Sequence, residues 1–135
     1  MIGKCLCGAV TLKAPRLQHV HACHCGMCRK WSGGPGLVVP CGPDIELSAT
    51  ENLATYRSSE WAERAFCARC GTHIYYKLLS TGDFYVPAGL FDDDGSFSMG
   101  EQIFIDRKPD WYSFANETPQ LTEAEVFAML AGDSN

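Results

Sequence analysis

Three cysteines fall within six residues in the segment Cys23-His24-Cys25-Gly26-Met27-Cys28. Side chains at positions i, i+2 and i+5 cannot share one face of a strand or a helix, so the chain must fold back on itself for the three sulfurs to converge. Three converging thiolates make a trigonal base for a tetrahedral zinc ion and leave its fourth corner open. The spacing therefore predicts a catalytic metal site with Cys23, Cys25 and Cys28 as its ligands.

A second pattern, Cys67-Ala68-Arg69-Cys70-Gly71, has the spacing of a zinc knuckle. One knuckle supplies two ligands, whereas a closed structural site needs four. Cys5 and Cys7, followed by Gly8, are the obvious partners, and pairing them with the knuckle closes a loop of about 60 residues. In an alternative grouping, the knuckle joins the three-cysteine segment and leaves Cys5 and Cys7 unused. In a further interpretation, all of these residues are buried or redox cysteines.

The composition fits one globular domain over residues 1–135, with 46% hydrophobic and 20% charged residues. We find no run of 18 apolar residues and no apolar leader near Met1, so we expect neither a membrane span nor a secreted precursor. In a cytoplasmic chain, eight cysteines favour metal ligation or thiol chemistry over disulfides. The net charge of -5 disfavours nucleic acid and anionic membranes as partners.

The elements that must position these cysteines are mostly short strands. Alternating or β-branched segments predict strands at residues 9–14, 17–22, 37–41, 45–47, 54–57, 72–79, 84–89 and 103–105. Residues 29–32 suit a short helical turn, and residues 92–95 an acidic loop. Thr122 and Glu125 form a capping box for one late helix over residues 121–132. The sequence therefore predicts a mainly β fold with a single C-terminal helix.

Several of these motifs together resemble the glutathione-dependent formaldehyde-activating enzyme family, which includes centromere protein V. The resemblance covers roughly residues 3 to 112. It lies in Gly3-x-Cys5-x-Cys7-Gly8-x-Val10, Cys23-His24-Cys25-x-x-Cys28-Arg29, Tyr56-Arg57-Ser58-Ser59, Arg64-x-Phe66-Cys67-x-x-Cys70-Gly71-Thr72, Gly89-Leu90-Phe91-Asp92 and a late Trp111.

The resemblance implies a β-tent fold of several coiled antiparallel sheets and two zinc ions per chain. A structural zinc would lie on Cys5, Cys7, Cys67 and Cys70, and a second, catalytic zinc on Cys23, Cys25 and Cys28. The implied activity joins formaldehyde and glutathione to S-hydroxymethylglutathione, or runs in reverse as a carbon–sulfur lyase. The sequence leaves open the true substrate, the direction, the tightness of the second zinc and the oligomeric state.

Three thiolates suit a zinc centre to binding one more sulfur, because zinc lowers the pKa of that thiol from about 8.5 toward neutrality. Our hypothesis is that a substrate thiol takes the open corner and attacks an aldehyde. Arg29, Lys30 and Arg64 are weaker candidates for holding a substrate carboxylate. The alternatives are a solvated helical turn for Arg29 and Lys30 and a structural ion pair for Arg64.

The remaining polar and aromatic candidates have ordinary structural interpretations. His24 should point away from the metal, and Cys41 should be a buried small hydrophobe rather than a redox partner. His19, His21 and His73 more often pack or face solvent, and Trp31 and Tyr75 more often belong to a core than to a pocket wall. Two competing functions remain, a non-catalytic zinc-stabilised binding module and a nucleic-acid-binding zinc ribbon.

Overall fold

The computed structural model describes residues 1–92 and 96–133. These residues group into two compact units, which we describe separately. Unit 1 contains Met1–Gln18 and Val39–Phe97, and unit 2 contains His19–Val38 and Ser98–Asn135. The single domain that the sequence predicts stays a prediction. Of the predicted acidic loop, residues 93–95 lie outside the described residues.

Unit 1 begins with a small antiparallel sheet of order β1-β2-β5. Its strands are β1 (Ile2–Lys4), β2 (Thr11–Lys13) and β5 (Glu46–Ser48). Val10 and Leu12 are buried, as the alternating pattern predicts, so one face of this sheet faces a core. The strand predicted over residues 9–14 is thus confirmed at its centre. β1 is too short for any pattern to reveal.

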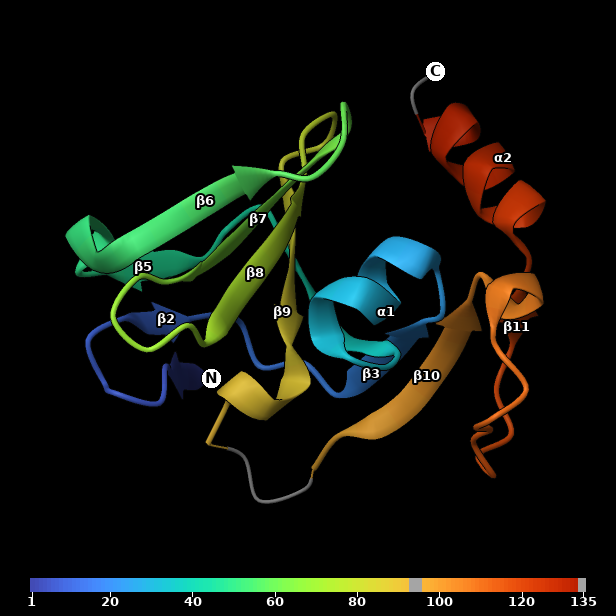
Figure 1. The fold of residues 1–135 in the computed structure, drawn as a ribbon, viewed down its shortest axis with the longest axis horizontal. Coiled ribbons are helices and arrows are strands. Elements are labelled where there is room, and N and C mark those ends of the chain that lie inside the picture. Colours follow the sequence, from blue (N-terminus) through green and yellow to red (C-terminus); the bar gives the residue numbers. More distant parts are fainter. Residues whose placement is uncertain (93–95, 134–135) are drawn as a thin grey trace. The chain divides into compact units, whose positions relative to one another are not determined.

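Most of the rest of unit 1 is an antiparallel meander (Figure 1). Its strands are β6 (Leu53–Arg57), β7 (Ala62–Cys67), β8 (His73–Leu78) and β9 (Asp83–Pro87). Ala65, Ile74 and Val86 from three of these strands have no exposed surface. Two short 3-10 helices, η1 (Thr50–Asn52) and η2 (Ala88–Leu90), flank the meander in sequence. Because consecutive strands pair, the end of β7 and the start of β8 meet in one tight turn.

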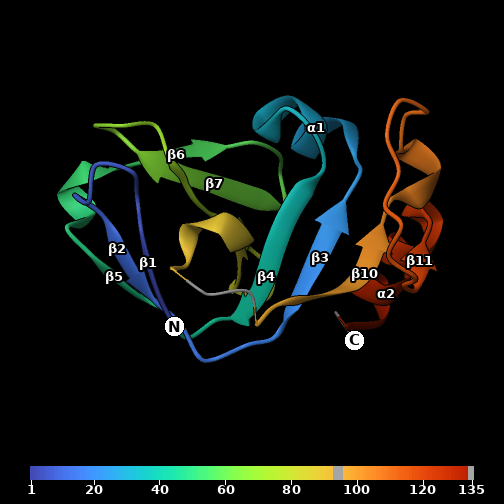
Figure 2. The same ribbon diagram turned by 90° about the horizontal axis from the view of Figure 1, so that it is seen from below.

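Unit 2 contains β3 (His19–Cys23), which pairs antiparallel with the first residues of β4 (Gly36–Gly42). On its other side β3 lies parallel to β10 (Ser98–Ile103), and β10 lies parallel to the short strand β11 (Gln120–Leu121). Figure 2 shows β3 and β10 side by side. The mainly β fold is confirmed, but these parallel pairings were not predicted.

The helices of unit 2 are α1 (Gly26–Ser32) and α2 (Glu123–Asp133). The capping box of α2 is confirmed, because Glu125 N donates to Thr122 Oγ1 (3.2 Å) and Thr122 N donates to Glu125 Oε1 (3.1 Å). The prediction of a single helix was incomplete. Where the sequence predicted only a short helical turn at residues 29–32, the structure has a seven-residue helix that begins at Gly26. No helix among the described residues has both the length and the apolar character needed to span a bilayer.

The predicted last strand over residues 103–105 is wrong beyond Ile103. Phe104 takes a left-handed conformation with φ of 56°, which ends β10 and starts the 3-10 helix η3 (Ile105–Arg107). A non-glycine residue in this region is strained. The Phe104 ring packs edge-on against Phe127 of α2 at 5.9 Å, and this contact helps to hold it there.

Candidate metal centres

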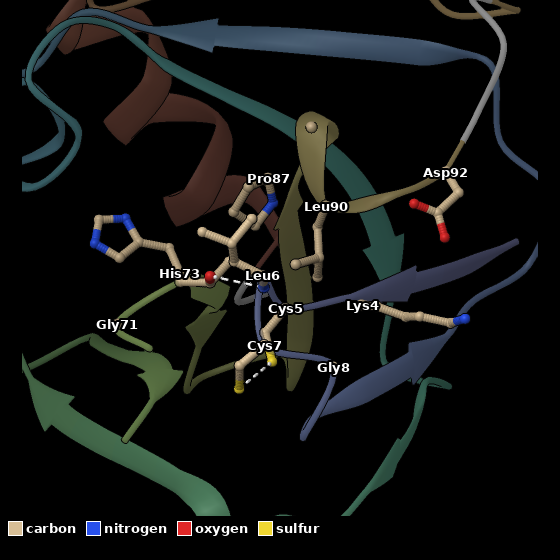
Figure 3. A pocket seen from close by; sticks show the side chains of 12 residues that line it. Lys4, Cys5, Leu6, Cys7, Gly8, Gly71, His73, Pro87, Leu90 and Asp92 are labelled. Carbon is tan, nitrogen blue, oxygen red and sulfur yellow. Dashed lines mark hydrogen bonds between the residues drawn. The ribbon is translucent and has the colours of Figure 1, made fainter. Parts of the chain in front are cut away.

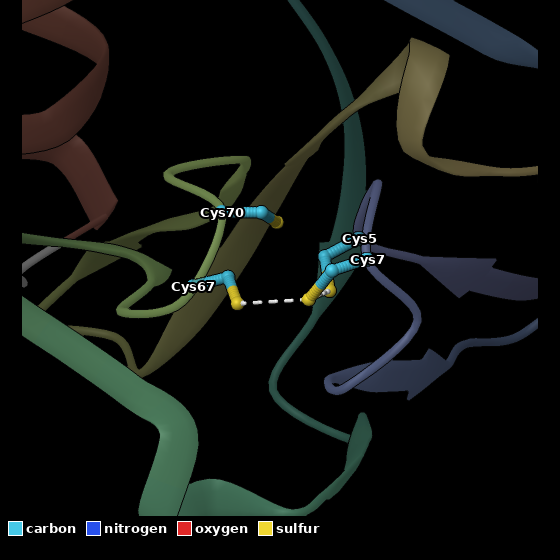
Figure 4. Close-up of side chains that lie close together, drawn as sticks. All are labelled: Cys5, Cys7, Cys67 and Cys70. Atoms are coloured by element: carbon cyan, nitrogen blue, oxygen red, sulfur yellow. Dashed lines mark hydrogen bonds between the residues drawn. The ribbon is translucent and has the colours of Figure 1, made fainter.

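The first candidate centre is a four-cysteine cluster in unit 1, formed by two turns that are far apart in the sequence. Cys5 and Cys7 lie between β1 and β2, Cys67 ends β7, and Cys70 lies in the turn before β8. Their four Sγ atoms all lie within 4.8 Å of one another (Figure 4). The structure thus groups the knuckle with Cys5 and Cys7, as the first of the two predicted groupings requires.

The sulfur spacing fits a tetrahedral zinc site. Zinc–sulfur bonds of about 2.3 Å place the sulfurs about 3.8 Å apart along each edge of the tetrahedron. Cys5 Sγ lies 3.6 Å from Cys7 Sγ, and Cys7 Sγ lies 3.8 Å from Cys67 Sγ. The four-cysteine cluster can therefore accept such an ion without moving its side chains far.

Each half of the cluster is a tight turn that ends in a left-handed glycine. Gly8 has φ of 80° and Gly71 has φ of 81°. Gly8 N donates to Cys5 O (3.0 Å), and Gly71 N donates to Cys67 O (2.7 Å). Only glycine adopts this conformation without strain, so the residue after each cysteine pair is fixed by the turn rather than by the metal.

Thr72 links the two halves of the four-cysteine cluster. Its hydroxyl accepts a hydrogen bond from Leu6 N (3.0 Å) and lies 3.2 Å from Cys70 Sγ, to which it can donate. This donation from Thr72 lowers the pKa of Cys70 to about 5. A thiolate is therefore favoured at Cys70, which is the form that ligates metal.

An open groove of about 780 Å³ borders the four-cysteine cluster in unit 1 (Figure 3). Cys5 and Cys7 lie on it together with Leu6, which is 90% exposed. Lys4, His73 and Asp92 also line the groove. The cluster is therefore open to solvent on the side of Cys7, whose side chain is exposed.

The second candidate centre is a three-cysteine cluster in unit 2. Cys23 is the last residue of β3, Cys25 is the N-cap of α1, and Cys28 lies in the first turn of that helix. Their Sγ atoms all lie within 4.8 Å of one another. The turn from strand to helix brings the i, i+2 and i+5 side chains together, as the spacing predicts.

The cap of α1 contributes to this geometry. Cys28 N donates to Cys25 Sγ (3.3 Å), and Arg29 N donates to Cys25 O (3.0 Å). Hydrogen bonds from the Cys23 and Cys28 thiols lower the pKa of Cys25 to about 2, with a further contribution from the backbone. The same contacts raise the pKa of Cys23. The cluster therefore holds negative charge on Cys25, and a cation would stabilise that charge.

Gly36 of β4 lies beside the three-cysteine cluster and pairs with Cys23 in the sheet. A Cβ atom at position 36 would lie 3.5 Å from Cys28 Sγ and 3.9 Å from Cys23 Cβ. The glycine thus leaves space next to the Cys28 sulfur and the Cys23 side chain. A longer side chain would fill that space.

His24 is fully buried, and its side chain binds away from the sulfurs. Tyr112 O–H donates to His24 Nδ1 (2.7 Å), and His24 Nε2 donates to Gln102 Oε1 (2.9 Å). Burial lowers the pKa of His24, so the ring is neutral and makes one bond of each kind. As expected from its place between two candidate ligands, the His24 ring binds Tyr112 and Gln102 and does not join the three cysteines.

Arg29 and Lys30 follow the three-cysteine cluster on α1. Arg29 Nε donates to His24 O (3.0 Å), so this part of the side chain braces the backbone between two cysteines. Lys30 is exposed. Arg64 of unit 1 is buried, donates from Nε to Ser58 Oγ (3.1 Å) and lies 5.0 Å from the centre of the Tyr76 ring.

Two further candidates have structural surroundings. Cys41 is 5% exposed, and its Sγ donates to Val39 O (3.4 Å). Burial raises the pKa of Cys41 to about 11, which suits a small hydrophobic residue rather than a reactive thiol. Tyr75 is 7% exposed and donates to Glu63 Oε2 (2.9 Å), so it belongs to the core of unit 1.

Sequence reasoning missed the residues that surround His24. Tyr112 and Gln102 lie 88 and 78 positions away from it, outside every motif that we recognised. A hint for Gln102 was the apolar run over residues 103–105 that directly follows it, beside which an uncharged polar residue needs a partner. For Tyr112 we find no such signal.

Comparison with known proteins places the chain near one family. The model of the family described as glutathione-dependent formaldehyde-activating enzyme matches residues 1–107. An uncharacterized lyase of Schizosaccharomyces pombe is 39% identical over 133 residues, covering 95% of each chain. A putative glutathione-dependent formaldehyde-activating enzyme of Podospora anserina is 34% identical over 102 residues, which cover 68% of this chain and 48% of that relative.

Among solved structures, a crystal structure of a Rhodobacter sphaeroides protein matches with a TM-score of 0.59 and 24% identity. The match covers 68% of this chain and 88% of the other. At this identity the likeness concerns the fold alone.

Proposed function

Because the chain belongs to the glutathione-dependent formaldehyde-activating enzyme family, we propose that it is a zinc-dependent carbon–sulfur lyase. It forms or breaks the adduct between a small-molecule thiol, such as glutathione, and an aldehyde, such as formaldehyde. The names of the two relatives support this class of reaction. The observation that carries the proposal is the three-cysteine cluster, whose sulfurs converge beside Gly36.

In this proposal the two clusters divide the work. The four-cysteine cluster would fill every corner of a tetrahedral zinc with sulfur and join the N-terminal turn to the β7–β8 turn, so an ion there would be structural. The three-cysteine cluster would supply three ligands and leave the fourth position for substrate. Two zinc ions per chain are expected, and the ion in the three-cysteine cluster should leave first on treatment with a chelator.

The chemistry follows from the number of sulfurs. A zinc ion in the three-cysteine cluster supplies a positive centre that favours a further thiolate and lowers the pKa of that thiol from about 8.5 toward neutrality. Gly36 leaves room for the incoming sulfur beside Cys28. The substrate sulfur then adds to the aldehyde carbon, and the carbonyl oxygen takes up one proton from solvent in place of the proton that the thiol released. The reverse reaction breaks the same carbon–sulfur bond.

The same proposal assigns weaker roles to cationic residues near the cluster. Arg29 and Lys30 directly follow Cys28, and a thiol peptide such as glutathione carries carboxylates that they can bind. Lys30 is the better placed of the two, because it is exposed and Arg29 Nε is engaged with His24 O. The substrate contact predicted for Arg64 stays a prediction.

Cobalt substitution tests whether a thiol enters the three-cysteine cluster. Addition of glutathione should change the absorption of cobalt in that cluster, and Cys25→Ser should remove the change together with formaldehyde consumption. Cys41→Ser is the matched control, because it replaces a buried cysteine outside both clusters and should keep the activity. A cobalt spectrum that no thiol alters would sink the proposal and favour a non-catalytic binding module of the same fold.

A further inference from the structure

His24 joins the three-cysteine cluster to a segment that follows the family match. The match ends at residue 107, whereas Tyr112 and Thr118 lie beyond it. Tyr112 O–H lies 2.7 Å from His24 Nδ1, and the two rings lie 5.5 Å apart. Phe114 packs on the same imidazole at 5.8 Å. The side chain of His24 is thus enclosed by residues from the C-terminal part of unit 2.

The hydrogen bonds around His24 form one directed chain. Gln102 Oε1 can only accept, so His24 Nε2 carries a proton, and in the neutral ring Nδ1 then accepts from Tyr112. Gln102 Nε2 donates in turn to Thr118 Oγ1 (3.2 Å), and the Thr118 hydroxyl donates to Pro119 O (3.0 Å). Each polar side-chain atom in the chain has a hydrogen-bond partner, and Gln102 is only 2% exposed. A satisfied buried network of this kind holds its members in one arrangement.

Lys108 holds Tyr112 in place. Its Nζ donates to Tyr112 O (2.6 Å), to Pro109 O (3.0 Å) and to Ser113 Oγ (3.1 Å). The same ammonium lies 5.4 Å from the centre of the Tyr112 ring. A single cation therefore organises the loop that carries the tyrosine.

The backbone of His24 is fixed as firmly as its ring. His24 N donates to Ile103 O (3.1 Å), and His24 O accepts from Arg29 Nε (3.0 Å). Because His24 separates Cys23 from Cys25, a rotation of its peptide would swing these two sulfurs apart. The ring contacts and the backbone contacts together resist that rotation.

We propose that Tyr112 and Gln102 are positioning residues, which act through His24 to hold the sulfurs of Cys23 and Cys25 at the spacing that a metal ion requires. This proposal rests on the proposed function in that the three-cysteine cluster is taken as the metal site. It adds that the segment after residue 107 tunes this site. Neither residue is one of the three candidate ligands.

The test compares metal release from matched variants. Tyr112→Phe keeps the ring and removes one hydroxyl, and Gln102→Leu removes the acceptor for His24 Nε2. Each should weaken metal binding at the three-cysteine cluster about tenfold, the scale on which groups that orient a metal site act. Gln102→Glu keeps an acceptor for His24 Nε2, so the metal affinity of this variant should stay within about threefold of that of the unchanged protein.

Stepwise release of zinc to a colorimetric chelator gives the readout, and Cys25→Ser identifies the step that belongs to the three-cysteine cluster. Tyr75→Phe is the control, because it removes a buried hydroxyl hydrogen bond to Glu63 in unit 1. It should lower the melting temperature without changing that step. The cobalt spectrum of Tyr112→Phe should also shift, because the angle between the sulfurs changes.

Unchanged release from both Tyr112→Phe and Gln102→Leu would overturn the proposal. Equal weakening of metal binding at both clusters would overturn it as well, since that result indicates general destabilisation. The experiment contains no thiol substrate and no aldehyde. If glutathione fails to alter the cobalt spectrum of the unchanged protein, the proposed function fails while this inference can still hold.

Discussion

Removing cysteines in pairs should destabilise the fold unequally, depending on which cluster loses them. The pair Cys67→Ser and Cys70→Ser removes half of the four-cysteine cluster, and the pair Cys23→Ser and Cys25→Ser removes most of the three-cysteine cluster. Both variants replace two thiols by hydroxyls of similar size. The two clusters differ in the length of the loop that a bound metal would close.

The difference can be worked from the sequence separation of the ligands. Cys7 and Cys67 lie 60 positions apart and their sulfurs 3.8 Å apart, whereas Cys23 and Cys28 lie five positions apart. The entropy of loop closure grows as the logarithm of loop length, so the longer loop should contribute about 2 kcal/mol more to the free energy of unfolding. The short cluster can also bind metal in the unfolded chain, which reduces its contribution further.

Urea unfolding of the zinc-loaded variants, followed by circular dichroism, measures this difference. The pair at Cys67 and Cys70 should lose at least about 2 kcal/mol more than the pair at Cys23 and Cys25. In excess chelator the two variants should become nearly equal, because neither cluster then closes a loop. Two results would refute this reasoning. One is an equal loss in the free energy of unfolding for both variants with zinc present. The other is a difference between the variants that excess chelator leaves unchanged.

Three further outcomes follow from single residues. Gly36→Ala should keep metal at the three-cysteine cluster, because its Cβ would lie at ordinary contact distance from Cys28 Sγ (3.5 Å). Gly36→Val should lose that metal, because its longer side chain would reach the sulfurs. Metal analysis that finds both variants fully loaded would contradict this. Burial, aided by the charge of Arg64, lowers the pKa of His73, so the unfolded state binds a proton that the folded state does not. The free energy of unfolding should therefore fall as the pH drops below about 6.5, and His73→Gln should flatten that dependence in urea titrations; an equally steep curve for the variant would argue against it. Cys41 should resist alkylation by iodoacetamide at pH 8 in the folded protein, because burial raises its pKa to about 11, and rapid modification found by mass spectrometry would disprove this.

The sequence predicted well what depends on local spacing. The knuckle at Cys67 and Cys70 and the convergence of Cys23, Cys25 and Cys28 need only short turns, and glycines next to cysteines signal such turns. The alternating pattern over residues 9–14 likewise predicted correctly that Val10 and Leu12 are buried. Each of these features is determined by residues within a few positions of one another, where the rules of local geometry apply.

The sequence could not predict what depends on contacts between distant segments. Helix α1 was underestimated because its N-cap is Cys25, a residue type that propensity does not associate with caps. The parallel pairing of β10 with β3 joins strands far apart in the chain, and no periodic pattern encodes such a choice. Phe104 ended its strand early because tertiary packing against Phe127 tolerates a left-handed backbone. The partners of His24 escaped detection for the same reason.

The exposed side chain of Cys7, at the edge of an open groove, has a consequence for a protein proposed to handle aldehydes. Formaldehyde is an electrophile that modifies thiols, and without a bound metal the exposed Cys7 sulfur would be open to it. A metal ion bound by all four cysteines would share electron density with the Cys7 sulfur and so slow that modification. The order of events therefore matters, since a chain that met formaldehyde before a metal filled the four-cysteine cluster would be modified at Cys7, where the N-terminal turn meets the turn between β7 and β8.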